Sequence, residues 1–414
     1  MLTATPADSG STRFTLYTIY FIYFFCGMTQ CFEGVFLPEF KEYFHLNYQQ
    51  QMYTMFAKNI PFLLAGGIGY LIRYTGYKRC MIAAMALFSL GTLLLVPGLR
   101  SGRYDLVLLG FFLIGLGFNF EIVAGNPMLS ALGPSRSASS RLNLGNALGA
   151  VAQIIAPATL SFIIPAAVIA VDAKLPYMER LFVALGVVLA LVSVVAFITR
   201  DIDIAASFGS GGQGSAVRGA IWSHSRVMLG FVTIFLILGV EAGLFGFYRN
   251  FLEDPGVGRM TAHQSQLLFT VYFAVFAFGR LAASWVQTKM LPTTHLIISL
   301  AGAMACLATA VLAKGMFAVA AVTAIGFFVS VLFPTLYSLA IENMGELTGQ
   351  ASGLLTMGFV GCALIPVLQG KLADSIGLQH SYALGLASYL FAMFYTFKMR
   401  QAASLSPVCG GTGN

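Results

Sequence analysis

Long apolar stretches alternate with short polar gaps along almost the whole chain. A helix that crosses a lipid bilayer needs about 20 consecutive, mainly apolar residues. Twelve stretches approach or exceed this length, approximately over residues 14–37, 48–72, 79–98, 104–130, 141–168, 178–199, 227–250, 264–287, 292–313, 316–341, 350–373 and 379–398. The pattern therefore predicts an all-α integral membrane protein with twelve transmembrane helices.

One gap is longer and more polar than the others. Residues 200–226 are rich in Gly and Ser, which is typical of an inter-domain linker. Six predicted helices lie on each side of this gap. We therefore expect an N-terminal six-helix bundle over 1–199, a cytoplasmic linker over 200–226, a C-terminal six-helix bundle over 227–400 and a cytoplasmic tail over 401–414.

The two halves resemble each other in one place. The fourth stretch ends NPMLSALG and the tenth runs FPTLYSLAIENMG, so that Pro127 and Pro334 occupy matching positions. The helix that follows opens SASSRLNL in the first half and TGQASGLL in the second, and it reaches a proline at 157 and 366. Weak internal symmetry of this kind is typical of transporters built from structural repeats. The sequence thus predicts two pseudo-symmetric halves.

Composition supports a membrane location and argues against other classes. The 414 residues are 58% hydrophobic and 9% charged, whereas soluble domains carry about 25% charged residues. The formal net charge of +7 is scattered over short gaps and forms no basic stripe, so we expect no nucleic-acid partner. The six cysteines show no metal-ligand spacing, and no nucleophile–base constellation is evident. We therefore expect neither an enzyme nor a bound metal.

Lys and Arg residues set the expected orientation. If the N-terminus is inside, more of them fall in inside gaps than in outside gaps, and the cluster of Arg73, Lys78 and Arg79 is inside. This bias favours both termini in the cytoplasm. On this assignment Lys174, Arg180 and Arg249, among others, lie in outside gaps.

Four ionisable residues fall inside predicted spans: Glu33, Lys58, Glu121 and Glu241. A charge at the bilayer centre costs about 2.5–3.5 kcal/mol on insertion scales, so such residues usually face a cavity or a partner. A carboxylate removed from water also binds a proton more readily than one at the surface. This is the chemistry that a proton-coupled transporter needs. The alternative for Glu33 and Glu121 is a structural ion pair between helices.

Lys58 has three possible roles. It can be the counter-ion of Glu33 or Glu121, in a charge pair that protonation breaks. It can contact a carboxylate on the substrate, which would then be an acidic sugar. It can also extend its ammonium group outward to the membrane surface and have no further role.

Four quoted segments carry a family resemblance. The run NPMLSALGPSRSASSRLNLGNALGAVAQIIAP resembles the signature of the fucose–galactose–glucose:proton symporter family, a branch of the major facilitator superfamily. The run LFPTLYSLAIENMGELTGQASGLLTMGFVGCALIPVLQGKLADSIG resembles the second-half signature of the same family. CFEGVFLPEF and GRLAASWV fit it as well. The resemblance implies the fold of that superfamily, alternating access, and proton-coupled uptake of a neutral monosaccharide.

The resemblance also implies roles for single residues. Glu33 and Glu121 match the proton-linked acids of helices one and four, although the helix-one acid is usually Asp. At Gly149 this chain lacks a side chain near a place where family members can carry a sugar-contacting Asn. Arg73 stands where many superfamily members have an Asp in the loop between helices two and three.

Amide side chains supply the paired donors and acceptors that sugar hydroxyls require. Asn143 and Asn146 are three residues apart, and Gln153 follows seven residues after Asn146, so one helix face carries an amide stripe. Asn126 and Asn143 can alternatively cap or bond nearby helix ends. Further candidate substrate contacts are Gln30, Asn126, Glu241 and Tyr337.

Four arginines are candidate gate contacts: Arg73, Arg136, Arg141 and Arg280. Plain solvated topology charges are the alternative for Arg136 and Arg141.

These inferences lead to one expected function. The chain is expected to be a proton-coupled symporter that imports a monosaccharide by rocker-switch alternating access, with the proton gradient as driving force and no cofactor. The expected partners are a sugar, protons and membrane lipids, and the expected state is a monomer in a bacterial inner (plasma) membrane. A uniporter, or a proton antiporter or exporter of a sugar-like or mildly acidic molecule, is the alternative. A non-transporting sugar receptor is more remote. The sequence does not name the sugar.

Overall fold

The computed structural model describes residues 10–132, 138–165, 168, 170–198, 224–341 and 348–405, and these are helical almost throughout, with no strand among them. In chain order, the elements are α1 (Gly10–Tyr43), α2 (Tyr48–Gln51), α3 (Tyr53–Asn59), η1 (Ile60–Leu64), α4 (Ala65–Thr75), α5 (Tyr77–Arg100), α6 (Tyr104–Ala131), α7 (Ala138–Ile163), α8 (Val171–Ile198), α10 (Ser225–Glu253), α11 (Ala262–Val286), α12 (Pro292–Leu312), α13 (Met316–Val329), α14 (Leu332–Ile341), α15 (Thr348–Thr356), η6 (Met357–Val360), α16 (Gly361–Ile376), α17 (Leu378–Ser381) and α18 (Ala383–Leu405).

The helices make twelve passes through the bundle, as the apolar pattern predicted. Among the described residues, nine helices are long and apolar enough to cross a membrane. The other three passes run over 48–75, 138–163 and 378–405. The first of these is divided by η1, and the second contains a shorter apolar helix, Leu144–Leu160. The predicted all-α membrane fold is confirmed.

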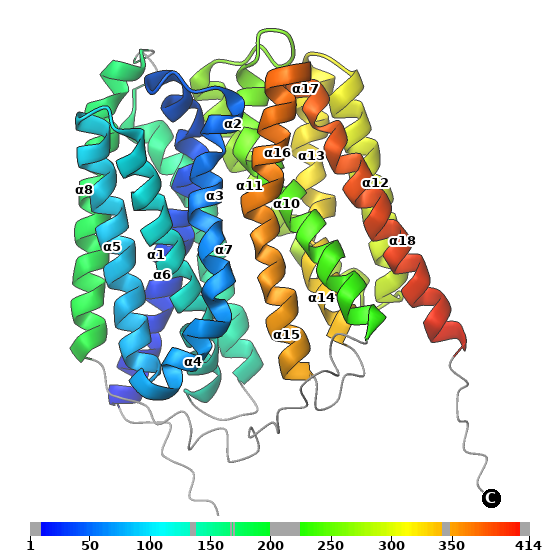
Figure 1. Cartoon of the computed structure of the whole chain (residues 1–414), viewed down its shortest axis with the longest axis horizontal. Helices are drawn as coiled ribbons and strands as arrows, with labels where there is room; N and C mark the ends of the chain where they lie inside the picture. Colours follow the sequence, from blue (N-terminus) through cyan, green and yellow to red (C-terminus); the bar gives the residue numbers. More distant parts are fainter. Residues whose placement is uncertain are drawn as a thin grey trace, which may run out of the picture.

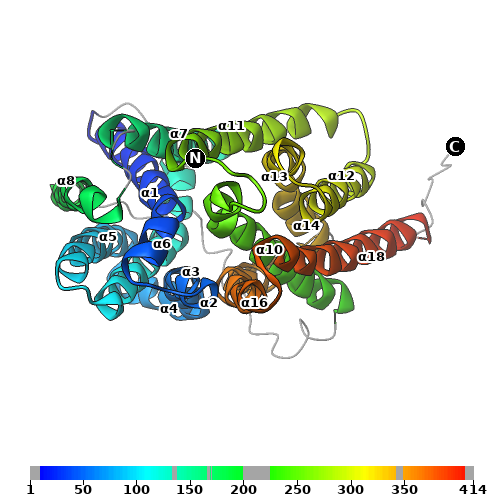
Figure 2. The ribbon, with the colours of Figure 1, turned by 90° about the horizontal axis from the view of Figure 1, so that it is seen from above.

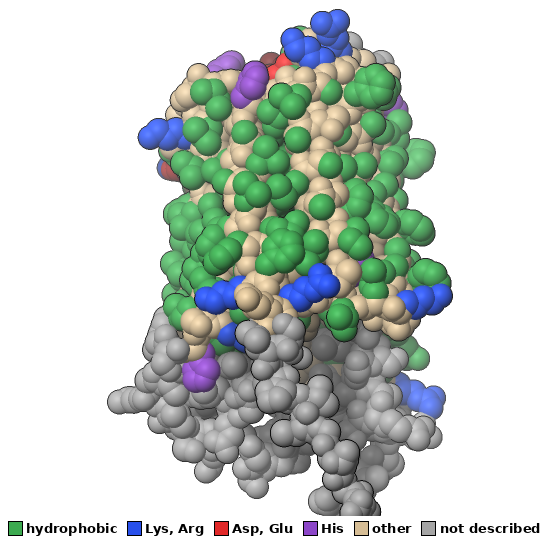
Figure 3. Space-filling view, turned by 90° about the vertical axis from the view of Figure 1, so that its right-hand side faces the viewer, with side chains coloured by type: hydrophobic (Ala, Val, Ile, Leu, Met, Phe, Trp, Pro, Cys, Tyr) green, Lys and Arg blue, Asp and Glu red, His purple; other side chains and the backbone are tan. Residues whose placement is uncertain are grey.

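Successive passes run in opposite directions, so the bundle has two distinct ends (Figure 1). The "terminal end" is the end where α1 and α10 begin and where α8 and α18 finish. The "far end" is the opposite one, where α1 finishes at Tyr43 and α10 at Glu253. Figure 3 shows one flank covered by hydrophobic side chains, with Lys and Arg gathered toward its two ends. This distribution fits a bundle that spans a bilayer.

Seen from above, the passes separate into two groups, α1–α8 and α10–α18 (Figure 2). The groups meet along three seams: α7 packs against α11, α2 and α3 pack against α16, and α1 packs against α10. Each group is held together by its own helix contacts, such as those of α5 with α6 and α8. The predicted two-halved architecture is therefore present.

Several helices are longer than their apolar runs indicated. The first pass continues through Pro38 to Tyr43, and α8 begins at Val171 rather than near residue 178. The sequence counted Lys174, Arg180 and Arg249 with the outside gaps, although Arg180 and Arg249 fall within the predicted spans 178–199 and 227–250. All three lie inside helices, so the gap assignment of Lys174 was wrong. A rule based on apolar length stops at the first charged residues, whereas a helix continues as long as its side chains find partners.

Three passes are interrupted near their middles. η1 follows Asn59 in the second pass, Ser330 and Val331 separate α13 from α14 in the tenth, and η6 follows Thr356 in the eleventh. The interruptions of the second and eleventh passes face each other. The rings of Phe62 and Phe359 stack there with centroids 5.1 Å apart. The side-chain amide of Asn119 donates a hydrogen bond of 2.6 Å to the Pro61 carbonyl. Short 3₁₀ segments within helices often mark hinges, and these two breaks lie where the two groups of helices touch.

Close helix packing depends on glycine at particular positions. A Cβ atom on Gly27 of α1 would overlap the backbone carbonyl of Gly149 in α7. A Cβ atom on Gly115 of α6 would likewise overlap the carbonyl of Lys58 in α3. Small residues at helix crossings are the usual device for close approach in membranes. The close approach of α1 and α7 therefore requires glycine at 27, whereas a Cβ atom on Gly149 itself would meet only the Tyr23 carbonyl oxygen, at 3.3 Å.

Replacing Gly27 by Leu is expected to force α1 away from α7 and to lower the midpoint temperature of thermal unfolding (Tm) in detergent. Overpacking of this kind costs about 1–3 kcal/mol or more. Gly67→Ala is the control, because a Cβ built there meets no described atom within 4 Å apart from its chain neighbours and the backbone of its own helix. That variant should leave Tm unchanged or raise it slightly. Equal losses of Tm in both variants would contradict the packing role of Gly27.

Candidate functional site

Glu33 and Lys58 form an ion pair inside the N-terminal half. Glu33 lies on α1 and Lys58 on α3, one residue before the helix breaks into η1. Their side chains are 0% and 8% exposed. Lys58 therefore points to Glu33 rather than outward to the membrane surface or to Glu121. A buried charge of this kind is tolerated because its counter-charge is adjacent.

The Glu33 carboxylate can accept more hydrogen bonds than the described residues donate to it. Apart from the ion pair, neither of its carboxylate oxygens has a hydrogen-bond partner among the described residues. A cavity of about 10 Å³ borders it, with Thr29 and Thr92 as the other polar lining residues. A void of that size is about what one water molecule needs. The site is therefore compact and much too small at this point for a monosaccharide.

The same turn of α1 also contacts α7. The backbone carbonyl of Gln30 lies 3.5 Å from the Lys58 ammonium nitrogen. The Cys31 thiol donates a hydrogen bond of 3.3 Å to the backbone carbonyl of Gln153. Gln153, half-buried, is thus held against the turn that carries Glu33. The structure brings together one predicted proton site, its charge partner and the backbone carbonyls of two predicted substrate contacts, Gln30 and Gln153.

Glu121 lies closer to the terminal end and in different surroundings. It is 2% exposed, on α6, and it forms no ion pair with any described residue. The Tyr23 hydroxyl and the Cys26 thiol of α1 are within electrostatic reach of it. The Tyr23 hydroxyl donates a 2.7 Å hydrogen bond to Asn126 Oδ1, five residues after Glu121. Cys26 precedes Glu33 by seven residues, a rise of about 10 Å along α1, so Glu121 faces a different level of α1 from the one that carries Glu33.

The predicted amide stripe on α7 is partly described. Asn146 is exposed and Gln153 is half-buried, and both lie on α7. Asn143 also lies on α7, but its side chain is outside the described part of the structure. Asn126 bonds Tyr23 on α1, so it links two helices in addition to any contact with substrate.

The C-terminal half has its own central charged group. Glu241 is half-buried in the middle of α10, and Arg280 of α11 is within electrostatic reach of it. Cys362 of α16 is within reach of Glu241 and also of Lys58 in the other half. Tyr337 packs against Phe333 with centroids 5.7 Å apart. Cys362 therefore lies within electrostatic reach of charged groups of both halves.

The arginines predicted as gate contacts bond within their own halves where they are described. Arg141 donates a 2.8 Å hydrogen bond to the Leu129 carbonyl. Arg280 lies over the Phe276 ring at 4.7 Å and donates to the Ser330 carbonyl at 3.3 Å. Arg73 lies on α4 with its side chain outside the described part. Arg136 lies outside the described residues altogether.

Sequence reasoning missed the polar contacts that join the halves at the far end. The Asp374 carboxylate accepts hydrogen bonds from the backbone amides of Tyr48 and Gln49 at 2.8 and 2.9 Å. Gln51 donates to Asn250 at 2.7 Å, and Gln266 donates to the Pro157 carbonyl at 2.9 Å. These residues sit at helix ends, where polar side chains are ordinarily solvated. Their sequence positions therefore carried little signal.

A second group of missed residues is ionic. Arg249 of α10 contacts Glu39 of α1 across the interface between the halves. Lys174 and Glu253 complete this group. The sequence carried one weak signal: Arg249 and Glu253 are four residues apart on a helix, a spacing typical of ion pairs.

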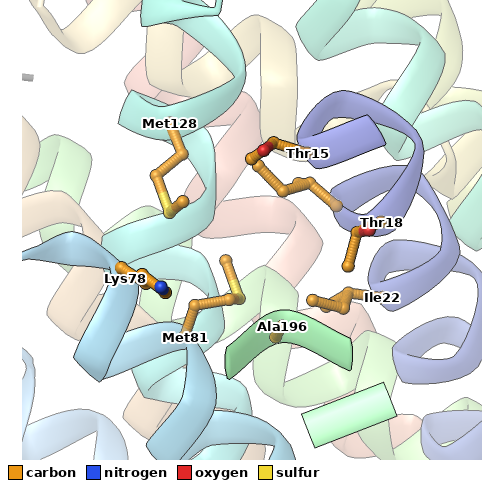
Figure 4. A pocket seen from close by; sticks show the side chains of 8 residues that line it. Thr15, Thr18, Ile22, Lys78, Met81, Met128 and Ala196 are labelled. Carbon is orange, nitrogen blue, oxygen red and sulfur yellow. The ribbon is translucent and has the colours of Figure 1, made fainter. Parts of the chain in front are cut away.

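A further small cavity lies inside the N-terminal half near the terminal end (Figure 4). It measures about 10 Å³ and is lined by Thr15, Thr18 and Lys78 together with Met81, Met128 and smaller aliphatic side chains. A cavity of that size holds about one water molecule and is too small for a sugar. Among the described residues, no group of three or more His, Cys, Asp or Glu side chains could hold a metal ion.

Comparison with known proteins places the chain. The family model of the Major Facilitator Superfamily matches residues 19–366. A glucose/galactose transporter of Brucella abortus (strain 2308) is 27% identical over 385 residues, which cover 92% of this chain and 93% of that protein. The L-fucose-proton symporter of Escherichia coli (strain K12) is 26% identical over 391 residues, which cover 88% of this chain and 87% of that protein.

Solved structures show the same fold. The crystal structure of the E. coli fucose:proton symporter FucP in the outward conformation matches with a TM-score of 0.67 and 21% identity, over 94% of this chain and 99% of that one. A bacterial homologue of the human lysosomal transporter Spinster, inward-facing and unoccupied, matches with a TM-score of 0.72 and 15% identity, over 96% and 98%.

Removing the charge of Lys58 alone is expected to destabilise the protein strongly. Lys58→Met leaves the Glu33 carboxylate buried without a counter-charge, which costs about 3–5 kcal/mol. The double variant Lys58→Met/Glu33→Gln removes both charges and should recover most of the Tm loss in detergent. Arg103→Gln is the control, because its ion pair with Asp105 is 60% and 63% exposed and is worth about 1 kcal/mol or less. A double variant as unstable as Lys58→Met would contradict this account.

Proposed function

The chain belongs to the major facilitator superfamily, whose members are transporters and not enzymes, and on that premise we propose that it is a proton-coupled symporter of a monosaccharide. The chain is similar to the branch of that superfamily with fucose, galactose and glucose transporters. One observation carries the proposal: Glu121 is a buried carboxylate, inside a membrane-spanning half, without an ion-pair partner among the described residues. Such a group is suited to gain and lose a proton as its surroundings change.

The two acids of the N-terminal half take different parts in this proposal. Glu121 carries the transported proton, since an ionised carboxylate at this place has no described cation to compensate it. Glu33 is compensated by Lys58. A proton on Glu33 would break that pair and free the Lys58 ammonium group. Glu33 is therefore the second candidate proton site. Its protonation would release Lys58, which lies two residues before the start of η1.

Sugar recognition is assigned to side chains near the middle of the bundle. Gln153 and Asn146 of α7 offer amide donors and acceptors, and Gln153 is held beside the Glu33 turn. Amide groups suit hydroxyl-rich ligands because one side chain both donates and accepts. The further proposed contacts are Asn126, Asn143, Gln30, Glu241 and Tyr337.

The proposed cycle follows from these roles. A proton neutralises Glu121, a sugar binds between the halves, and the halves rock so that the site opens to the other side of the membrane. The contacts between the halves that the structure describes lie at the far end and in the middle, so the far side is closed in this state. The proton gradient supplies the free energy, and no cofactor is required.

The cellular setting belongs to the proposal as well. The chain is placed in a bacterial inner membrane as a monomer, with both termini in the cytoplasm. The terminal end would then face the cytoplasm and the far end the outside.

Glu121→Gln is expected to abolish sugar accumulation driven by an inward proton gradient in proteoliposomes. A Gln side chain keeps the shape and cannot carry the proton, so exchange of labelled for unlabelled sugar without a gradient should continue. Glu179→Gln is the control, since its ion pair with the two-thirds-exposed Arg100 lies at the molecular surface. Full gradient-driven accumulation by Glu121→Gln would refute the proton role of Glu121. Sugar accumulation by the unmodified protein that is driven by an outward proton gradient would instead support the antiporter.

A monosaccharide screen tests the substrate class. Fucose, galactose, glucose and N-acetylated hexosamines are added to the purified protein, and the shift of Tm is measured at two pH values. One of them is expected to raise Tm, because a ligand that binds the folded state stabilises it. Gln153→Ala should weaken that sugar's binding about tenfold, as expected for one lost hydrogen bond of ~1.4 kcal/mol. No shift with any neutral sugar, together with a shift by a uronic acid, would point to Lys58 as a ligand of an acidic substrate.

A further inference from the structure

Four charged side chains meet at the far end of the interface between the halves. Glu39 of α1 and Lys174 of α8 belong to the N-terminal half, and Arg249 and Glu253 of α10 belong to the C-terminal half. The Arg249 guanidinium contacts both carboxylate oxygens of Glu39, at 2.7 and 3.0 Å. It also donates to the backbone carbonyl of Val35 on α1. We name these four residues, Glu39, Lys174, Arg249 and Glu253, the charge latch.

Three residues of the charge latch are buried although they lie near the end of the bundle, and the side chain of the fourth, Glu253, is 25% exposed. Arg249 is 1% exposed, and it is one of the largest fully buried side chains among the described residues. Glu39 and Lys174 are 5% and 6% exposed. Ser265 of α11 bonds both Arg249, at 3.3 Å, and Glu253. Removal of these charges from water is costly, so the contacts among them must compensate that cost.

The contacts divide the charge latch into two neutral pairs. Within the N-terminal half, the Lys174 ammonium group lies 3.2 Å from Glu39. Within the C-terminal half, Arg249 lies 2.8 Å from Glu253, four residues along the same helix. The Glu39–Arg249 contact alone joins these two pairs. If the halves separate here, each carboxylate therefore keeps a cation and each cation keeps a carboxylate.

This division has an energetic consequence. Breaking an ordinary buried ion pair leaves two uncompensated charges, which would hold an interface permanently closed. Here separation breaks the two-pronged Glu39–Arg249 contact and leaves a neutral pair in each half. The interface is thus held closed by charge and can still open. The other polar contacts between the halves at this end do not pair two ionised side chains.

From this arrangement we propose that the charge latch sets the balance between the two access states: Glu39–Arg249 closes the far side, and the two retained pairs make its opening reversible. The proposal rests on the alternating access of the proposed function. It concerns the conformational equilibrium alone and assigns the charge latch no contact with sugar or transported proton.

The proposal predicts opposite effects for residues of the same cluster. Glu39→Gln or Arg249→Gln removes the contact between the halves and shifts the protein toward opening at the far end. Lys174→Met or Glu253→Gln keeps that contact but removes the partner that one half would retain after separation. These two variants should shift the protein toward closure at the far end. A merely structural cluster would lose stability in all four variants without such a division.

Hydrogen–deuterium exchange with mass spectrometry on the full chain in lipid nanodiscs, without sugar or gradient, separates these outcomes. In Glu39→Gln, backbone amides over 34–52 and 244–265 should exchange about tenfold faster, and those over 65–80 should exchange more slowly. Lys174→Met and Glu253→Gln should show the reverse pattern. Asp105→Asn is the matched control, because its ion pair with Arg103 is exposed and joins two residues of one half. It should leave the exchange pattern unchanged.

Three results would overturn the charge latch: no change in Glu39→Gln, changes of one sign in all four variants, or equal changes in Asp105→Asn. If Glu39→Gln fails to fold, Arg249→Gln tests the same contact, because Glu39 then keeps Lys174. The exchange measurement needs no transport. A failed sugar-uptake assay with a divided exchange pattern would therefore reject the proposed function and leave the charge latch standing, and the converse result would reject the charge latch alone.

Discussion

A charge placed in a membrane interior needs a counter-charge nearby, and the arrangement of this protein depends on that constraint. Water cannot compensate a buried carboxylate or ammonium group there, so the partner must come from the fold. Glu33 obtains Lys58 from the next pass. Glu39 obtains Lys174 from its own half and Arg249 from the other. Each pairing brings together residues that lie far apart in the sequence and sets the approach of two helices.

The pairs differ in whether they cross the interface between the halves. Glu33–Lys58 lies within one half, beside the η1 break, so a change in its charge acts on the shape of that half. Glu39–Arg249 crosses the interface, so it acts on the separation of the halves. Glu121 has no described ion-pair partner, and it is therefore the acid that we propose exchanges a proton during the cycle. One constraint thus gives three acids, two on α1 and one on α6, three different surroundings.

Much of the fold followed from the sequence because the thickness of the bilayer fixes the length of apolar sequence that each spanning helix needs. The twelve passes followed from these lengths, and the two halves followed from the similarity between residues 126–157 and 334–366. Helix ends were less predictable, as Lys174 and Arg249 show. A rule based on apolar length treats a charged residue as the end of a span. Lys174 and Arg249 nevertheless lie inside helices, and each pairs with Glu39 on a different helix.

The sequence by itself determined which residue types lie inside the membrane, and thereby the candidates Glu33, Lys58, Glu121 and Glu241. It left three roles open for Lys58, because partner choice depends on distances between helices. Tertiary structure decided that Lys58 meets Glu33, that Gly27 is needed for packing against Gly149, and that Arg249 joins the halves through Glu39. Composition and periodicity describe one helix at a time, and a counter-charge on another helix is visible once the helices are packed.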